Sequence, residues 1–205
     1  MSLDDMGLKH GTDKASSNHN YLDRYEALFN YDRDLFLERG RKINLLEIGV
    51  SDARSLFTWK EYFFDCANIY GIDINEKCKQ YEKEGIRIFI GDQGDDSFLE
   101  SVCNQIPDGL DFIIDDGSHY NHHILSSFEF LWPKLNDLGI YVIEDLHSAY
   151  LNNKFNPLNS ENPMDFLFAR IKDMEFNGKC INEDISGSPE NQCRAHLLER
   201  SANYL

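Results

Sequence analysis

The sequence predicts an α/β fold built on a doubly wound, mostly parallel β-sheet. Between residues 43 and 143, short and nearly continuous apolar runs alternate with stretches of helical periodicity. Runs of this kind are typical of parallel strands that are buried on both faces and joined by helical crossovers. Most of the runs are followed by acidic residues, and in such sheets ligands bind at the carboxyl ends of the strands. The functional residues are therefore expected at these strand ends.

The elements follow one another in a regular order. A leading helix is predicted over residues 20–39. The five strands, expected in the spatial order 3-2-1-4-5, are predicted over residues 43–50, 68–74, 87–91, 110–114 and 140–143. Helical stretches are predicted over residues 55–64, 76–83, 97–106, 124–135 and 164–176. Residues 152–163, rich in Asn, Ser and Pro, predict a loop, and the pattern from residue 177 onward determines no element.

The length of 205 residues favours one domain over residues 1–205 with a modest extension. We expect an N-terminal lid and helix (10–42), a βα core (43–150) and a loop and helical C-terminal extension (151–205). Residues 11–21 fit either a lid over a ligand or a fixed loop. The pattern predicts no element before residue 20, and residues 1–3 are left out of the fold prediction. A homo-oligomer is compatible with the sequence.

Composition narrows the choice of partners. The 20 basic and 36 acidic residues give a net charge of −16, which would repel nucleic acid and anionic membranes. No apolar run approaches the roughly 20 residues of a membrane helix. The five cysteines are odd in number and include no C-x-x-C pair, which favours a reducing, cytoplasmic location. The expected partner is a small molecule or a cation.

The first strand end excludes two classes of nucleotide. It carries a single glycine, Gly49, where a dinucleotide fingerprint needs three, and no Gly-Lys-Ser/Thr opens the following helix to cradle a triphosphate. Asp73 follows Gly49 by 24 residues, close to the spacing at which an acid accepts hydrogen bonds from a ribose. Glu47 and Asp52 add negative potential suited to an ammonium or sulfonium group. These demands together describe S-adenosylmethionine.

Acidic pairs end the fourth and fifth strands, at residues 115–116 and 144–145. Because these strands are neighbours in the predicted order, several carboxylates would converge and repel one another without a cation. Oxygen ligands select Mg²⁺ or another hard divalent cation. Successive strand residues face opposite sides, so at most one of Asp115 and Asp116 is expected to point into the site. The alternative is that these acids cap the helices that follow them.

His119 follows Asp116 by three residues, on the loop that opens the next helix. It is therefore a candidate base for the proton of a metal-bound hydroxyl, with a solvated loop histidine as the alternative. His122 and His123 lie inside the start of that helix and are interpreted as surface or packing residues, with His123 as a remote reserve ligand.

Six segments together carry a family resemblance. They are residues 11–14 with His19 and Tyr21, 45–50, 69–73, 91–93, 113–119 and 142–146, and they cover most of residues 10–150. In this ordered set the sequence resembles the class I S-adenosylmethionine-dependent methyltransferases. Within that class it is most similar to the metal-dependent sugar O-methyltransferases of macrolide biosynthesis and to the cephalosporin-hydroxylase-like proteins.

The resemblance implies a Rossmann-like methyltransferase fold and a set of site residues. Asp73 is expected on the ribose and Asp92 near the adenine amino group. The full set of predicted cofactor contacts is Glu47, Gly49, Ser51, Asp73, Asp92, Gln93 and Asp115. The resemblance selects Asp116, with Glu144 and Asp145, as the metal ligands. Two departures from the family stand out: Ala53 replaces a second glycine in the first loop, and the usual β-hairpin after strand five is not evident.

The predicted function is an S-adenosylmethionine-dependent O-methyltransferase that acts, with a divalent metal, on a hydroxyl of a sugar or similar small polyol. Two alternatives stay open. One is a cephalosporin-hydroxylase-like or sugar-processing protein on the same fold. The other is a non-catalytic module that binds S-adenosylmethionine, which the Ala53 substitution makes conceivable. The sequence does not identify the acceptor.

Overall fold

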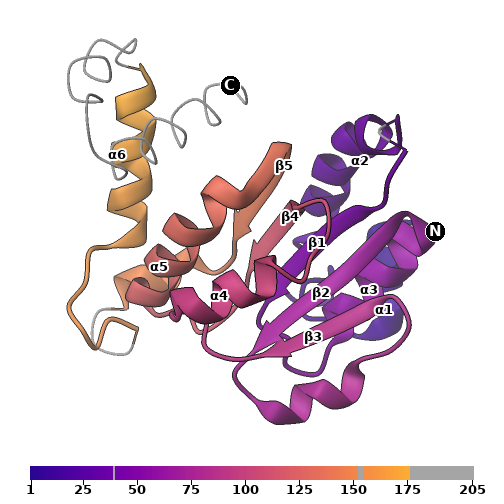
Figure 1. Ribbon diagram of the computed structural model, residues 1–205, viewed down its shortest axis with the longest axis horizontal. Helices are drawn as coiled ribbons and strands as arrows, with labels where there is room; N and C mark the ends of the chain where they lie inside the picture. The colour runs from indigo at the N-terminus through magenta and orange to yellow at the C-terminus, as the bar shows by residue number, and fades with distance from the viewer. Residues whose placement is uncertain (39, 152–154, 176–205) are drawn as a thin grey trace.

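The sheet has the predicted topology. The structure is a computed structural model that describes residues 1–38, 40–151 and 155–175. Five parallel strands lie in the order β3-β2-β1-β4-β5 (Figure 1). In chain order the strands are β1 Ile43–Ile48, β2 Ala67–Asp73, β3 Ile86–Ile90, β4 Leu110–Asp115 and β5 Leu135–Ile143. The predicted doubly wound α/β fold and its strand order are confirmed.

Six α-helices and four short 3₁₀ segments are found in the described residues. The α-helices are α1 Leu3–His10, α2 Leu22–Glu38, α3 Arg54–Phe63, α4 Asp96–Cys103, α5 Asn121–Leu131 and α6 Pro163–Glu175. The 3₁₀ segments are η1 Phe64–Cys66, η2 Glu76–Tyr81, η3 Trp132–Lys134 and η4 Leu146–Tyr150. Helices α4 and α5 lie on one face of the sheet and α1 to α3 on the other (Figure 1).

The alternation of side chains along β1 divides the core into two layers. Ile43 and Leu45 pack with the residues of α1, α2 and α3, whereas Leu46 and Ile48 pack with those of α4 and α5. All six residues of β1 are buried, because a central parallel strand is covered on both faces. By the same alternation, successive polar side chains near the strand ends point to opposite faces of the sheet. This alternation determines which of them can meet in one site.

Three sequence predictions are corrected by the structure. Residues 2 and 3 do take part in the fold: the Ser2 side chain caps α1 in a reciprocal capping box with Asp5, and Leu3 is fully buried. The helical stretch predicted over residues 76–83 is the 3₁₀ segment η2, which begins at an Asn75 side-chain cap and ends at residue 81. The last strand begins at residue 135, not 140, because an irregular register between β4 and β5 extends the pairing.

Beyond β5 the chain leaves the sheet. Helix α6 lies outside α5 (Figure 1), where Phe166 contacts Phe128 with ring centroids 6.1 Å apart. The prediction of a helix over residues 164–176 is confirmed to within one residue at its start, and residue 176 lies outside the described residues. The question of a β-hairpin in residues 177–205 also falls outside them. No helix in the described part of the chain is both long and apolar enough to cross a membrane.

Gly49 is required where β1 turns toward α3. Its φ is +95°, in the left-handed region that disfavours side chains, and a Cβ added there would overlap the carbonyl oxygen of Asp116. The backbones of the loops after β1 and β4 therefore approach closely at this point. Since the obstacle is backbone, no flexible side chain can move to relieve the clash.

We expect Gly49→Ala to lower the free energy of unfolding by at least about 3 kcal/mol, because it combines the φ penalty with a backbone clash. Gly40→Ala is the matched control: its φ is +67°, but no atom of the described residues lies within 4 Å of where its Cβ would be, so a loss of about 1 kcal/mol is expected. Urea denaturation measures both. Equal losses in the two variants would contradict the close approach.

Candidate active site

Two cavities open at the carboxyl ends of the strands. The first, of about 330 Å³, lies between the N-terminal loop after α1 and the loop after β1. The second, of about 270 Å³, is lined by the ends of β2 and β3 and by the loop after β4. Gly49, Ser51 and Asp116 line both cavities. One elongated ligand could therefore occupy the two spaces together.

Asp73 holds the loop after β1, which contributes residues to both cavities. Its Oδ2 accepts hydrogen bonds from the backbone N–H groups of Val50 at 2.9 Å and Ser51 at 3.0 Å. Its Oδ1 accepts from the N–H of Asn75 at 2.8 Å. The predicted ribose carboxylate thus also holds the loop after β1, in which Ser51 and Ala53 have left-handed backbones. Ala53, at the glycine position of the family, is fully buried in this conformation.

The second cavity is lined by five of the predicted cofactor residues and by His123. The five are Gly49, Ser51, Asp73, Asp92 and Gln93, and their contact with a cofactor stays a prediction. His123, interpreted from sequence as a surface or packing residue, lines it too. Its Nδ1 lies 2.8 Å from Ser118 Oγ and its Nε2 lies 3.7 Å from Asp92 Oδ1.

Asp115 lies behind Gln93 and not with Asp116. Ser127 Oγ donates to its Oδ2 at 2.6 Å, and Gln93 Nε2 donates to its Oδ1 at 3.2 Å. Burial raises the pKa of Asp115 to about 6, despite these hydrogen bonds, which favour the ionised form. The prediction that at most one of the two neighbouring acids enters the cluster at the strand ends is confirmed. A direct contact of Asp115 with a cofactor stays a prediction.

Asp116, His119 and Asp145 converge at the ends of β4 and β5. Each offers one ligand atom, and the three atoms lie within 4.8 Å of one another. His119 Nε2 is 3.8 Å from Asp116 Oδ1 and 4.0 Å from Asp145 Oδ2. The Tyr21 hydroxyl donates to Asp145 Oδ1 at 2.9 Å, and burial together with Asp145 raises the pKa of Tyr21 to about 12. We call this half-buried group the outer face of the acidic cluster.

Two residues of the outer face have an unusual backbone conformation. His119 and Asp145 have φ values of +58° and +54°, in a region that non-glycine residues rarely adopt. Such conformations concentrate at functional sites, where the surrounding structure holds them.

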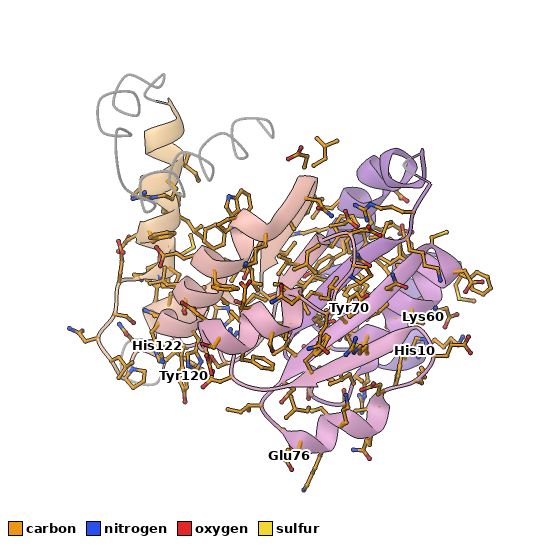
Figure 2. The ribbon with its side chains drawn as sticks, viewed as in Figure 1. His10, Lys60, Tyr70, Glu76, Tyr120 and His122 are labelled. Atoms are coloured by element: carbon orange, nitrogen blue, oxygen red, sulfur yellow. The ribbon has the colours of Figure 1, made fainter. Side chains whose placement is uncertain are left out.

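The loop with His119 then enters α5, where the rings of Tyr120 and His122 stack with centroids 5.7 Å apart; Figure 2 labels both residues.

Lys14 lies on the other side of Asp116, where it meets Glu47 and Glu144. Its Nζ is 2.9 Å from Glu144 Oε2 and 3.5 Å from Glu47 Oε1, and it also pairs with Asp116 Oδ2. The Lys14 side chain is 2% exposed. Tyr25 donates to the other oxygen of Glu144 at 2.5 Å. We call Lys14 with these three carboxylates the inner face of the cluster.

Burial and charge oppose each other on the inner face. Burial acts to lower the pKa of Lys14, but the negative charges of Glu47, Glu144 and Asp116 outweigh it and raise that pKa. Burial raises the pKa of Glu47 to about 7, although the Lys14 ammonium acts to lower it. Lys14 therefore carries its charge in an otherwise negative and dry environment.

The predicted metal ligands are thus divided between the two faces. Asp116 belongs to both, Asp145 to the outer face, and Glu144 to the inner face. Glu47 has no exposed surface and receives a hydrogen bond from Trp59 Nε1 at 2.6 Å. In this conformation its side chain can influence a ligand only through the residues that it contacts. Its direct contact with a cofactor stays a prediction.

Sequence reasoning missed Lys14, Tyr21 and Tyr25 as site residues. All three come from the N-terminal region and reach acids more than 100 positions away in the chain. Lys14 and Tyr21 stand in the segments that carry the family resemblance, which was the available signal. Nothing in the periodicity of the helix that contains Tyr25 distinguishes it from a core residue.

Comparisons with known proteins agree with this fold. No protein-family model matches the chain. The 8-demethyl-8-alpha-L-rhamnosyl tetracenomycin-C 2'-O-methyltransferase of Streptomyces olivaceus is 36% identical over 152 residues, which are 71% of this chain and 38% of that protein. The mycinamicin VI 2''-O-methyltransferase of Micromonospora griseorubida is 39% identical over 128 residues, 59% of this chain and 31% of that protein.

Solved structures similar to this chain are also methyltransferases. The MycE methyltransferase of mycinamycin biosynthesis, in complex with Mg and SAH, matches with a TM-score of 0.74 and 30% identity over 85% of this chain and 49% of that one. A second structure of MycE, which also contains mycinamycin VI, matches with a TM-score of 0.69 and 32% identity over 85% of this chain and 48% of that one.

The fold is that of the class I S-adenosylmethionine-dependent methyltransferases. Within this class, the resemblance to the macrolide sugar O-methyltransferases is confirmed by both the sequence relatives and the solved structures. The chain spans between about a third and a half of the length of these relatives.

Proposed function

We propose that this chain forms the methyl-transfer site of an S-adenosylmethionine-dependent O-methyltransferase that acts on a sugar hydroxyl of a small molecule with the help of a divalent cation. The observation that carries the proposal is the convergence of Asp116, His119 and Asp145 beside two cavities that share Asp116. The names of the relatives, which are O-methyltransferases of rhamnosyl tetracenomycin and of mycinamicin VI, support a sugar as the acceptor.

The cavities fit S-adenosylmethionine. We assign the adenosine half to the second cavity, where Asp73 and Asp92 offer carboxylate acceptors to the ribose and the adenine amino group. We assign the methionine half to the first cavity, which the loop from Gly49 to Asp52 lines. Gly49, Ser51 and Asp116 line both cavities, which supports one ligand across the two. Bound there, the cofactor supplies an electrophilic methyl group.

The acidic cluster fits a hard divalent cation such as Mg²⁺. Asp116 and Asp145 offer carboxylate oxygens on a half-buried surface, and Mg²⁺ is usually bound by one or two carboxylates with water or substrate completing the shell. Glu144 is the proposed third ligand, and it shares its oxygens with Lys14 and Tyr25. A cation held by these residues would polarise an acceptor hydroxyl.

His119 is the proposed base. Its side chain is 24% exposed and its Nε2 faces the carboxylates of Asp116 and Asp145, which supports a role in accepting the proton of a hydroxyl bound beside these acids. The His119 ring also packs edge-on against Phe155, with centroids 6.3 Å apart.

Calorimetry with S-adenosylhomocysteine, with and without MgCl₂, tests the proposed function, followed by a methyl-transfer assay on a panel of glycosylated natural products. We expect binding of the nucleoside, and transfer that EDTA abolishes and Mg²⁺ restores. Transfer that persists in EDTA would contradict the metal role. Binding without transfer to any glycoside would favour a non-catalytic module, and no binding would reject the proposal.

We expect Asp73→Ala to weaken binding of S-adenosylhomocysteine by at least tenfold, since a charged hydrogen bond is worth about 1.5–3 kcal/mol. The loss of the N–H partners of Val50 and Ser51 adds to the effect. Asp65→Ala, an exposed acid just before the opposite end of β2, is the control and should bind normally. Calorimetry measures both affinities. Normal affinity in Asp73→Ala with an unchanged melting temperature would remove the ribose assignment.

We expect His119→Ala to lower kcat by about 10²- to 10⁴-fold, the usual contribution of a general base, and to leave cofactor affinity near normal. His147→Ala is the control, because the exposed His147 also approaches Asp145, at 4.0 Å, without belonging to the convergent group. Steady-state kinetics on an accepted glycoside compare the two. A loss in His147→Ala and not in His119→Ala would reassign the base.

A further inference from the structure

Lys14 occupies a position that the proposed chemistry does not explain. It comes from the loop after α1, yet its ammonium lies among carboxylates from the ends of three strands: Glu47 of β1, Asp116 after β4 and Glu144 after β5. The side chain is almost completely buried. An isolated ammonium in such a place would be strongly unfavourable, so the pairing with these acids is what keeps it there.

The acids of the inner face depend on Lys14 in return. Tyr25 and Trp59 donate to Glu144 Oε1 and Glu47 Oε2, but these neutral donors bring no positive charge. Glu47 Oε1 is buried and has no hydrogen-bond partner among the described residues, and the Lys14 ammonium lies 3.5 Å from it. Three carboxylates thus surround one ammonium, and its loss would leave them to repel one another, with Glu47 and Glu144 almost completely buried.

Asp116 connects Lys14 to the outer face. Its Oδ2 pairs with Lys14, and its Oδ1 is turned toward His119, 3.8 Å away. Because Lys14 holds Asp116 Oδ2 on the inner face, Asp116 Oδ1 is directed toward the outer face. The ammonium therefore sets the orientation of a proposed metal ligand without lying on the outer face itself.

We propose that Lys14 is a positioning residue: it serves as a resident cation that assembles the acidic cluster before a divalent cation binds, so that the fold at this end of the sheet does not depend on the metal. This inference rests on the proposed metal site and deepens it. Two consequences follow. Without Lys14, the metal-free protein should be destabilised, and an added divalent cation should restore more stability than it gives to the wild type.

Thermal unfolding and calorimetry of Lys14→Met test this inference. In EDTA we expect the melting temperature to fall by about 10 °C, because one partner of a buried ion-pair group is removed. We expect the rise in melting temperature on adding MgCl₂ to be at least twice that of the wild type. Calorimetry with MnCl₂ should show an affinity higher by roughly tenfold, because a nearby positive charge has been removed.

Lys9→Met is the matched control. Lys9 pairs with Glu61 at 2.7 Å on an exposed surface, so its removal should change neither the melting temperature in EDTA nor the response to metal. If Lys14→Met does not fold, Lys14→Met/Glu47→Gln replaces it: with one carboxylate fewer to compensate, the double variant should fold in EDTA and still show the enlarged response to Mg²⁺.

The outcomes separate this inference from the proposed function. A wild type stabilised by Mg²⁺, with a Lys14 variant that melts at the same temperature in EDTA or gains no more from Mg²⁺, would overturn the role of Lys14 alone. No effect of Mg²⁺ or Mn²⁺ on any of the proteins would overturn both the metal site and the inference.

Discussion

The candidate site depends on the repulsion between carboxylates that a parallel sheet brings together. Strands β1, β4 and β5 all end at the same edge, and acids from each of them meet around Asp116. Positive charge inside such a cluster offsets this repulsion. The N-terminal segment supplies that charge through Lys14 and adds the hydroxyl donors Tyr21 and Tyr25. The N-terminal segment is thus part of the site and helps hold the sheet edge together.

The sheet was predictable because its signals are local. Apolar runs of four to eight residues and the acids that follow them require no knowledge of distant contacts, and they indicated all five strands. The order of the strands followed from the fold class that these runs define. Helix α1 was missed because its eight residues carry little apolar periodicity, and because its stability comes from the Ser2 cap and from Leu3 packing into the core. Segment η2 was mistaken for a helix since composition alone does not separate a 3₁₀ turn from an α-helix.

The site was only partly predictable, and the reason is geometric. Alternation along β4 correctly separated Asp115 from Asp116, which pair with Ser127 and Lys14 on opposite sides of the sheet. No pattern indicates that Glu144 turns toward Lys14, or that His123 reaches the cavity beside Asp92, because both depend on pairings across 130 and 31 positions of the chain. The roles of the predicted ligands and of His119 stay predictions.

The hydrogen bonds to Asp73 have a consequence for ligand discrimination. In nucleotide-binding proteins of related topology, the N–H groups that follow the first strand are open to a phosphate. Here the N–H groups of Val50 and Ser51 already donate to a carboxylate. A phosphorylated ligand would have to displace Asp73 and would then face its charge. The loop therefore leaves neither N–H group free for a phosphate, and its internal hydrogen bonds disfavour a phosphorylated ligand at this position.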